Sequence, residues 1–253
     1  MDALILAAGF GSRLREVEPC KPLTQVGDMS LLEIGVRQLA AVGAKRCVVA
    51  TGYRAEQIEA ALPAIADRTG IEVEARRVDD HRQPNGYSVI TGAQGLGEQF
   101  LLAMADHVFA TSVLERLFAA PVPENGVVLA TDRRIASPLV DPDDATWVAT
   151  DGQGNIVRIG KGIADFDRVD CGVFVATQAL PHAIRAAIGE GASGSLSDGM
   201  QRLATAGRAR AADIGEGWWL DVDDARALDL ARKQAPAHIG YLAGAPSDML
   251  AAG

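Results

Sequence analysis

The feature that most constrains this chain is its opening, where a short apolar segment, residues 3–8, runs directly into Gly9 and Gly11. A strand that ends in glycines is typical of open α/β sheets, which bind ligands at the carboxyl ends of their strands. Because glycine lacks a Cβ atom, the backbone N–H groups of residues 8–12 can turn toward an anion. The opening therefore predicts an α/β fold with an anion-binding loop at one edge of its sheet.

Strand-like and helical patterns alternate over residues 1–110, which is typical of βαβ units. Beyond residue 120 the strands are shorter, and turn residues at 151–155 predict a β-hairpin. We expect a mixed, mainly parallel central sheet flanked by helices, with a small antiparallel subregion. The expected strands lie at 3–8, 46–51, 71–78, 100–106, 126–131, 146–160 (the hairpin), 171–177 and 208–214, and the expected helices at 30–43, 54–66 with a break near Pro63, 88–96, 181–188 and 223–233.

The composition argues against several classes of function. A formal net charge of −9 disfavours nucleic acid and anionic membrane surfaces as main partners, because both need a positive field. The three cysteines are far apart, so neither a disulfide framework nor a zinc site is predicted, and a reducing cytoplasm fits best. No segment approaches the roughly 20 apolar residues of a membrane span, and the first residues lack the pattern of a signal peptide. We therefore expect a cytoplasmic protein without membrane insertion.

Two cations follow the glycine loop. Arg13 and Lys21 add positive charge to it, and Pro22 restricts the backbone beside the lysine. A dinucleotide fingerprint would need a glycine at Leu14 and an acidic residue after the second strand, which ends with residues 50–52, Ala-Thr-Gly. A P-loop needs a different glycine spacing. A polyphosphate cradle is the favoured interpretation, with a dinucleotide site and a plain turn as alternatives.

Residues 6–13, "LAAGFGSR", and the later Lys-Pro pair resemble the signature of the sugar-phosphate nucleotidyltransferase superfamily. Its members join a nucleoside triphosphate to a phosphate monoester and release pyrophosphate. The resemblance implies a Rossmann-like nucleotidyltransferase fold in which the loop and Arg13 hold the triphosphate and Lys21 contacts it during transfer. It assigns catalysis to Arg13, Lys21 and Asp106, and nucleotide binding to Leu6, Ala7, Ala8, Gly9, Gly11, Ser12, Arg13 and Lys21.

Three aspartates are candidate ligands for Mg²⁺, which phosphoryl and nucleotidyl transfer usually require. Asp106 ends the fourth apolar strand and so lies at the edge that carries the glycine loop. Asp221 and Asp223 share one side of an extended segment because alternate residues share a face. The motif around Asp106 is similar to the family's Gly-Asp-His metal motif, with Ala105 in place of glycine. The alternative is that Asp106 and Asp223 cap turns or helices.

The base and the acceptor have separate candidates. Residues 83–88 are expected to form a polar loop at the same sheet edge, and the corresponding loop of the superfamily reads the nucleobase. This implies base contacts for Asn85, Gly86 and Ser88, although the Asn-Gly pair is also an ordinary turn signal. The acceptor-binding candidates in the second half are Lys161, Asp170, Arg133 and Ser197. A surface lysine is the alternative for Lys161. Asp170, Ser197 and the adjacent Asp198 supply hydrogen-bond groups suited to a polyol, and the alternative for Asp198 is that it stabilises a helix start.

Further segments, including "NGYS", "ADHVF", "LSD" and "WWLDVDD", are most similar to the CTP:inositol-1-phosphate cytidylyltransferases, over residues 1–232. The resemblance implies transfer of CMP from CTP to inositol 1-phosphate, giving CDP-inositol and pyrophosphate. Aminoethyl- or hydroxyethylphosphonate and phosphocholine remain alternative acceptors, and a CTP-binding regulatory module is the non-catalytic alternative. We expect one domain, 1–234, with a nucleotide-binding half (1–110), an acceptor-binding half (111–234) and a loosely packed tail (235–253); a homodimer is left open.

Overall fold

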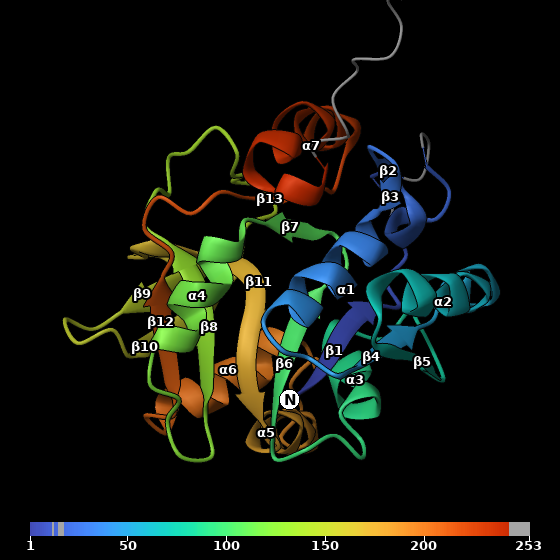
Figure 1. Ribbon diagram of the computed structural model, residues 1–253. Helices are drawn as coiled ribbons and strands as arrows, with labels where there is room; N and C mark the ends of the chain where they lie inside the picture. The colour runs from blue at the N-terminus through green and yellow to red at the C-terminus, as the bar shows by residue number, and fades with distance from the viewer. Residues whose placement is uncertain (12, 15–17, 243–253) are drawn as a thin grey trace, which may run out of the picture.

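A nine-stranded sheet forms the centre of the molecule, and helices cover both of its faces (Figure 1). The computed structural model describes residues 1–11, 13–14 and 18–242. The main strand order is β10-β9-β11-β6-β1-β4-β5. A branch leaves it at β11, where β8 pairs with β11 and β12 pairs with β8. Within this sheet, β10 and β11 run antiparallel to the other strands. The mixed, mainly parallel fold is thus confirmed. The strands are β1 (Asp2–Ala7), β4 (Arg46–Thr51), β5 (Glu72–Arg77), β6 (Gln99–Met104), β8 (Val127–Asp132), β9 (Trp147–Thr150), β10 (Ile156–Gly160), β11 (Arg168–Thr177) and β12 (Ala209–Asp213).

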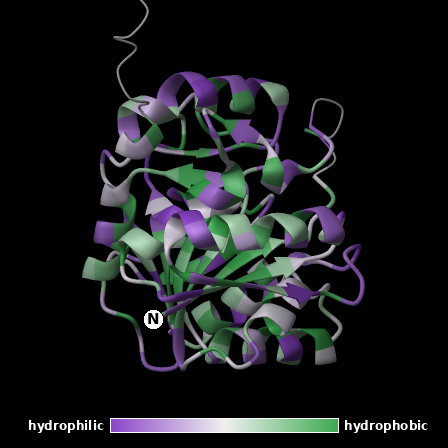
Figure 2. Ribbon diagram, turned by 45° about the vertical axis from the view of Figure 1, so that its right-hand side comes forward, coloured by the Kyte–Doolittle hydropathy of each residue, from purple (hydrophilic) through white to green (hydrophobic). Residues whose placement is uncertain are grey.

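The core has one layer on each side of this sheet. Successive residues of β1 alternate between the layers: Ile5 packs with one cluster, and Leu4 and Leu6 pack with the other. Both faces are therefore apolar, as expected for buried parallel strands, and Figure 2 shows hydrophobic residues concentrated along the sheet. One face is covered by α1 (Leu31–Ala41), α2 (Ala55–Thr69) and α4 (Thr111–Ala119), and the other by α3 (Asn85–Gly92), α5 (Ala179–Gly189) and α6 (Leu196–Thr205).

A smaller two-stranded sheet lies beyond the end of β6. Its strands, β7 (His107–Phe109) and β13 (Trp219–Asp221), are antiparallel and pair His107 with Asp221. The helix α7 (Ala225–His238) packs against this sheet through a third apolar cluster that contains Leu220 and Leu228. Short elements complete the described chain: η1 (Lys21–Leu23), β2 (Gln25–Val26), β3 (Met29–Ser30) and η2 (Gly240–Leu242). The small sheet is what brings residues 221–223 to the edge that carries the glycine loop.

Three local predictions were wrong. The helix α2 continues through Pro63, which lies on its exposed face, where water can satisfy the carbonyl group left without a donor. The helix α3 begins at Asn85, so the predicted loop 83–88 is largely its first turn. The helix α7 extends to His238, and Ile239 and Leu242 are buried, so residues 235–242 are packed rather than loose. Residues 243–253 lie outside the described part of the chain.

Candidate active site

The loop after β1 forms the wall of a first pocket, here called the loop pocket. The residues that line it include Leu6, Ala7, Gly9, Gly11, Arg13 and Lys21, together with Asp106, Asp144 and Asp223. Gly11 has a φ of +58°, and a Cβ atom there would lie 3.0 Å from the Lys21 Cβ. Glycine is therefore needed both for the turn and for the close approach of Lys21.

Lys21 is held between two of the predicted carboxylates. Its Nζ lies 2.7 Å from Asp106 Oδ2 and also pairs with Asp223, and its side chain is only 9% exposed. Asp106 reaches this position because the chain leaving β6 stays beside β1, where the Ala105 N–H donates to the Leu6 carbonyl at 3.1 Å. The structure thus brings together Lys21, Asp106 and Asp223, which are far apart in the sequence.

His107 connects Asp106 to Asp221. Its Nδ1 lies 2.7 Å from Asp106 Oδ1 and 3.8 Å from Asp221 Oδ1. Burial acts to lower the pKa of His107, but the carboxylates of Asp221 and Asp106 outweigh it and raise the pKa to about 9. The imidazole is consequently protonated at neutral pH and donates to Asp106.

The neighbouring carboxyl groups respond differently to burial. Burial acts to raise the pKa of Asp106, but Lys21 and His107 outweigh it and hold that pKa well below its usual range. Burial raises the pKa of Asp221, partly opposed by His107. Burial also raises the pKa of Asp170 to about 6, although the Gly172 N–H opposes it. Asp106 is therefore the most firmly ionised of the three carboxyl groups.

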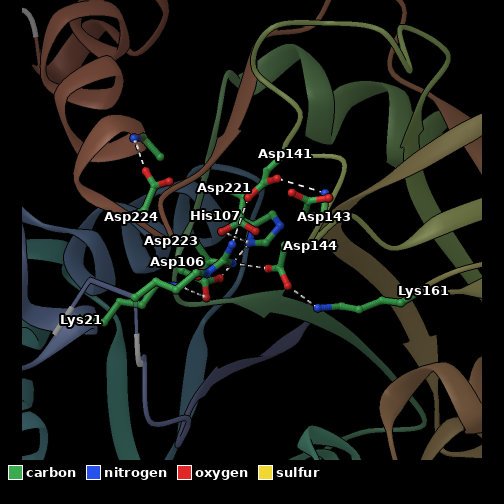
Figure 3. Close-up of polar contacts among 12 residues, drawn as sticks. Lys21, Asp106, His107, Asp141, Asp143, Asp144, Lys161, Asp221, Asp223 and Asp224 are labelled. Carbon is green, nitrogen blue, oxygen red and sulfur yellow. Dashed lines mark hydrogen bonds and ion pairs between the residues drawn. The ribbon is translucent and has the colours of Figure 1, made fainter.

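Arg13 is surrounded by three carboxylates. One of its terminal nitrogens lies 3.0 Å from Asp141 Oδ2, and the other pairs with Asp144 and Asp223. Asp144 also pairs with Lys161 (Figure 3). Asp141 and Asp144 were missed by the sequence analysis, because residues 141–144, Asp-Pro-Asp-Asp, have the composition of an ordinary turn and no spacing that points to a ligand.

A second pocket adjoins the first and shares Arg13, Asp106, Asp144 and Asp223 with it. It has a volume of about 200 Å³. Three predicted acceptor residues line it, namely Lys161, Asp170 and Ser197, together with Asn85.

The structure places Arg133 elsewhere. Its Nε lies 2.7 Å from Asp213, and its side chain lines a separate pocket beside the β9–β10 hairpin. Its predicted place in the acceptor site is corrected accordingly: β8 carries it toward the Asp213 end of β12.

The other predicted base contacts have structural explanations. A Cβ atom at Gly86 would lie 2.2 Å from the Gly194 carbonyl oxygen, so this glycine allows α3 to pack against the segment before α6. Ser88 is buried, and neither residue lines either pocket. Asn85 Oδ1 accepts from the Leu196 N–H at 2.8 Å. The helical start of α3, which the sequence analysis placed three residues later, accounts for this difference.

Some of the remaining acidic residues cap helices. Asp224, not Asp223, caps α7, since its Oδ1 accepts from the Ala227 N–H at 2.7 Å. Asp198 forms a capping box with Ser195 at the start of α6, which confirms the capping alternative for Asp198. Ala8 is buried, and its carbonyl accepts from the Tyr53 N–H. Ser12 lies outside the described residues.

Two groups of side chains here could hold a metal ion. Asp106, His107 and Asp221 form one, and Asp144, Asp221 and Asp223 form the other. Oδ1 of Asp221 is buried and accepts no hydrogen bond from the described residues. His107 Nδ1, at 3.8 Å, is too distant to donate a hydrogen bond to this buried oxygen, and a divalent cation coordinated by carboxylates would supply a partner. The residues at this position therefore fit a hard, oxygen-preferring metal ion.

Comparison with known proteins gives concordant matches. A sequence profile of the MobA-like NTP transferase domain matches residues 3–149. The chain is 35% identical over 236 residues to a "Bifunctional IPC transferase and DIPP synthase" of Rubrobacter xylanophilus, covering 92% of this chain and 51% of that protein. It is 30% identical to a "CMP-5'-(3-aminopropyl)phosphonate synthase" of Streptomyces rubellomurinus, covering 88% of this chain and 37% of that one.

A solved structure resembles the whole described fold. The inositol-1-phosphate CTP transferase from T. maritima superposes with a TM-score of 0.76 at 26% identity, over 92% of this chain and 95% of that chain. The bifunctional relatives are longer proteins, and this chain spans 51% of the Rubrobacter one. Among the described residues, no helix combines the length and apolar character required to cross a bilayer.

Proposed function

Because the chain belongs to the MobA-like NTP transferase family, we propose that it is a cytidylyltransferase that transfers CMP from CTP to inositol 1-phosphate. The products are CDP-inositol and pyrophosphate. The observation that carries this proposal is the convergence of Arg13 and Lys21 with Asp106 and Asp223 at the glycine loop, directly beside a pocket that contains Lys161. Preplaced cations next to carboxylates suit a reaction that builds charge on phosphate oxygens.

The choice of CTP and of an inositol phosphate is supported by similarity to a protein whose name includes these substrates. The T. maritima enzyme is named for CTP and inositol 1-phosphate, and it matches this chain over nearly the whole length of both. A phosphonate acceptor is the second candidate, because a CMP-phosphonate synthase is 30% identical to this chain. The second pocket, whose acidic lining includes Asp170, is suited to either a polyol or an amine.

In the mechanism, Arg13 and Lys21 neutralise the triphosphate while an acceptor phosphate oxygen attacks the α-phosphorus in line. The bond to the bridging oxygen breaks, and pyrophosphate leaves. A phosphate monoester has a second pKa near 6, so it is largely dianionic at neutral pH and needs no general base. His107 is therefore not required as a base; its Nδ1 lies 2.7 Å from Asp106 Oδ1 and orients that carboxylate.

A metal ion fits the same centre. We propose that Asp221, which belongs to both groups, would hold it together with Asp106 from one group and Asp223 from the other, and we assign the ion as Mg²⁺. When bound, Mg²⁺ supplies electrophilic stabilisation of the phosphate charge. Asp106 contributes independently of the ion by fixing the Lys21 ammonium beside the loop.

A pyrophosphate-release screen tests the proposal. Four nucleoside triphosphates are crossed with inositol 1-phosphate, aminoethylphosphonate, hydroxyethylphosphonate and phosphocholine, in the presence of Mg²⁺. We expect the combination of CTP and inositol 1-phosphate to give the highest kcat/KM. Activity only with a phosphonate or phosphocholine would replace the acceptor, and saturable CTP binding without pyrophosphate from any acceptor would favour a regulatory module.

A further inference from the structure

One carboxylate in the site contacts cations on both of its sides. Asp144 Oδ2 pairs with Arg13, and Asp144 Oδ1 pairs with Lys161 (Figure 3). In the proposed function these two cations serve different substrates, since Arg13 faces the triphosphate and Lys161 faces the acceptor. Asp144 also lines both pockets. It is therefore placed to respond to either substrate.

Asp144 belongs to a turn that is held together as a unit. The N–H groups of Asp144 and Ala145 donate to the Asp141 carbonyl at 3.2 and 2.9 Å, and the Asp143 N–H donates to Asp141 Oδ1 at 3.0 Å. We call residues 141–145 the acidic turn. Two of its carboxylates contact Arg13, and one contacts Lys161. Displacement of the acidic turn from Arg13 therefore also moves Asp144 relative to Lys161.

A triphosphate at the glycine loop competes with the acidic turn. Its oxygens seek the same guanidinium donors that Asp141 and Asp144 occupy, and their negative charge repels both carboxylates. Because hydrogen bonds join Asp141 to residues 143–145, displacement of these carboxylates from Arg13 would also separate Asp144 from Lys161. The ammonium group of Lys161, whose side chain is 61% exposed, would then be available to a second phosphate.

We propose that Asp144 couples the two substrate subsites, so that binding of the nucleotide at Arg13 releases Lys161 and strengthens binding of the acceptor's phosphate. This inference rests on the proposed function, because it takes Arg13 and Lys161 as contacts of two phosphate-bearing substrates. Coupling between binding sites is reciprocal, so the acceptor strengthens nucleotide binding by the same factor. We expect a factor of about five to ten, toward the low end for coupled sites.

The first test measures the release of Lys161 without turnover. The rate at which an amine-specific acetylating reagent modifies Lys161 is followed by mass spectrometry, with and without α,β-methylene-CTP and Mg²⁺. In the wild type we expect the analogue to raise this rate several-fold. In Asp144→Asn the rate should be high in both conditions. Asp143→Asn is the matched control, because it makes the same change in the same turn at a residue that pairs with no cation in the described structure, and it should respond like the wild type.

The second test measures the coupling factor by calorimetry with inositol 1-phosphate as the probe. The wild type should bind it about five- to tenfold more tightly when the analogue is present. In Asp144→Asn and in Lys161→Gln the ratio should fall to about one. If Asp144→Asn does not fold, Lys161→Gln still tests whether the coupling depends on the pairing of Asp144 with Lys161.

Three results would overturn the inference: no effect of the analogue on wild-type Lys161, a full effect in Asp144→Asn, or weaker binding of the analogue to Asp144→Asn, which would identify Asp144 as a metal ligand instead. Failure of the proposed function is a separate result. It would appear as absence of pyrophosphate release with every acceptor, whereas the modification of Lys161 is measured without any acceptor.

Discussion

At the scale of single residues, two cationic side chains of the site, Lys21 and Arg13, each pair with more than one carboxylate. Lys21 is nearly buried and has both Asp106 and Asp223 as partners, so its ammonium is held in one place before any phosphate arrives. Preorganised charge of this kind acts on the transition state without the cost of reorganisation. Arg13 differs, because it is 39% exposed and shared among three carboxylates. Lys21 is therefore the residue whose loss should affect chemistry most selectively.

Replacement of Lys21 by alanine should lower kcat by about 10²- to 10³-fold, because removing one preorganised donor costs about that much. Pyrophosphate release under saturating CTP measures the effect. Lys45→Ala is the matched control, since Lys45 is an exposed lysine remote from both pockets. If Lys21→Ala kept more than about a third of wild-type turnover, Lys21 would have no part in catalysis.

At the scale of elements, contacts between helices outside the two pockets support the site. Gly86, in the first turn of α3, packs against Gly194 just before α6. Glu33, in α1, is 2% exposed and accepts hydrogen bonds from Arg37 at 2.9 Å and from Arg68 of α2 at 2.7 Å. The first contact joins α3 to the segment before α6, and the second joins α1 to α2 on the opposite face of the sheet.

Gly86→Ala should lower the free energy of unfolding by about 1–3 kcal/mol. The new methyl group would clash with the backbone carbonyl oxygen of Gly194, which cannot move aside as a flexible side chain could. Urea denaturation measures the loss. Gly152→Ala is the matched control, since a Cβ atom there meets nothing within 4 Å and should leave stability nearly unchanged. Equal effects of the two substitutions would show that Gly86 is not needed for this packing.

Glu33→Gln should lower the free energy of unfolding by about 1–3 kcal/mol at pH 7, a range reduced because Arg68 is half exposed. Burial acts to raise the pKa of Glu33, but Arg68 and Arg37 outweigh it and lower the pKa. A carboxyl group with a depressed pKa stabilises the fold above its unfolded pKa of about 4.3 and loses that contribution as pH falls through the folded value.

The difference between wild type and Glu33→Gln should therefore shrink as the pH falls below about 4.3. Urea denaturation across this range measures it. Glu115→Gln, on the exposed face of α4, provides the comparison. A difference that did not depend on pH would mean that the pairing of Glu33 with its arginines is not its source.

The sequence predicted most elements because their signals are local. The capping residue Ser30, the turn at 151–155 and the apolar runs of β1, β4 and β6 each reveal their structure within a few residues. The pairing of β7 with β13 joins segments more than 100 residues apart, and no local signal specifies it. The same holds for the acidic turn, because its role depends on contacts with Arg13 and Lys161, which are distant in the sequence.

At the scale of the whole molecule, the fold brings charged groups from six separate segments to one rim of the central sheet. The glycine loop, η1, the end of β6, the acidic turn, the turn after β10 and the segment after β13 each contribute, and Figure 3 shows Lys21 and Lys161 on opposite sides of the aspartates.

A crystal structure with α,β-methylene-CTP and Mn²⁺ tests this convergence most directly, because the anomalous signal of manganese locates the ion independently of the rest of the density. We expect the ion between the carboxylates of Asp106 and Asp221, with the triphosphate against Gly11, Arg13 and Lys21. A triphosphate bound away from the glycine loop, or an ion without a contact to either aspartate, would contradict the account.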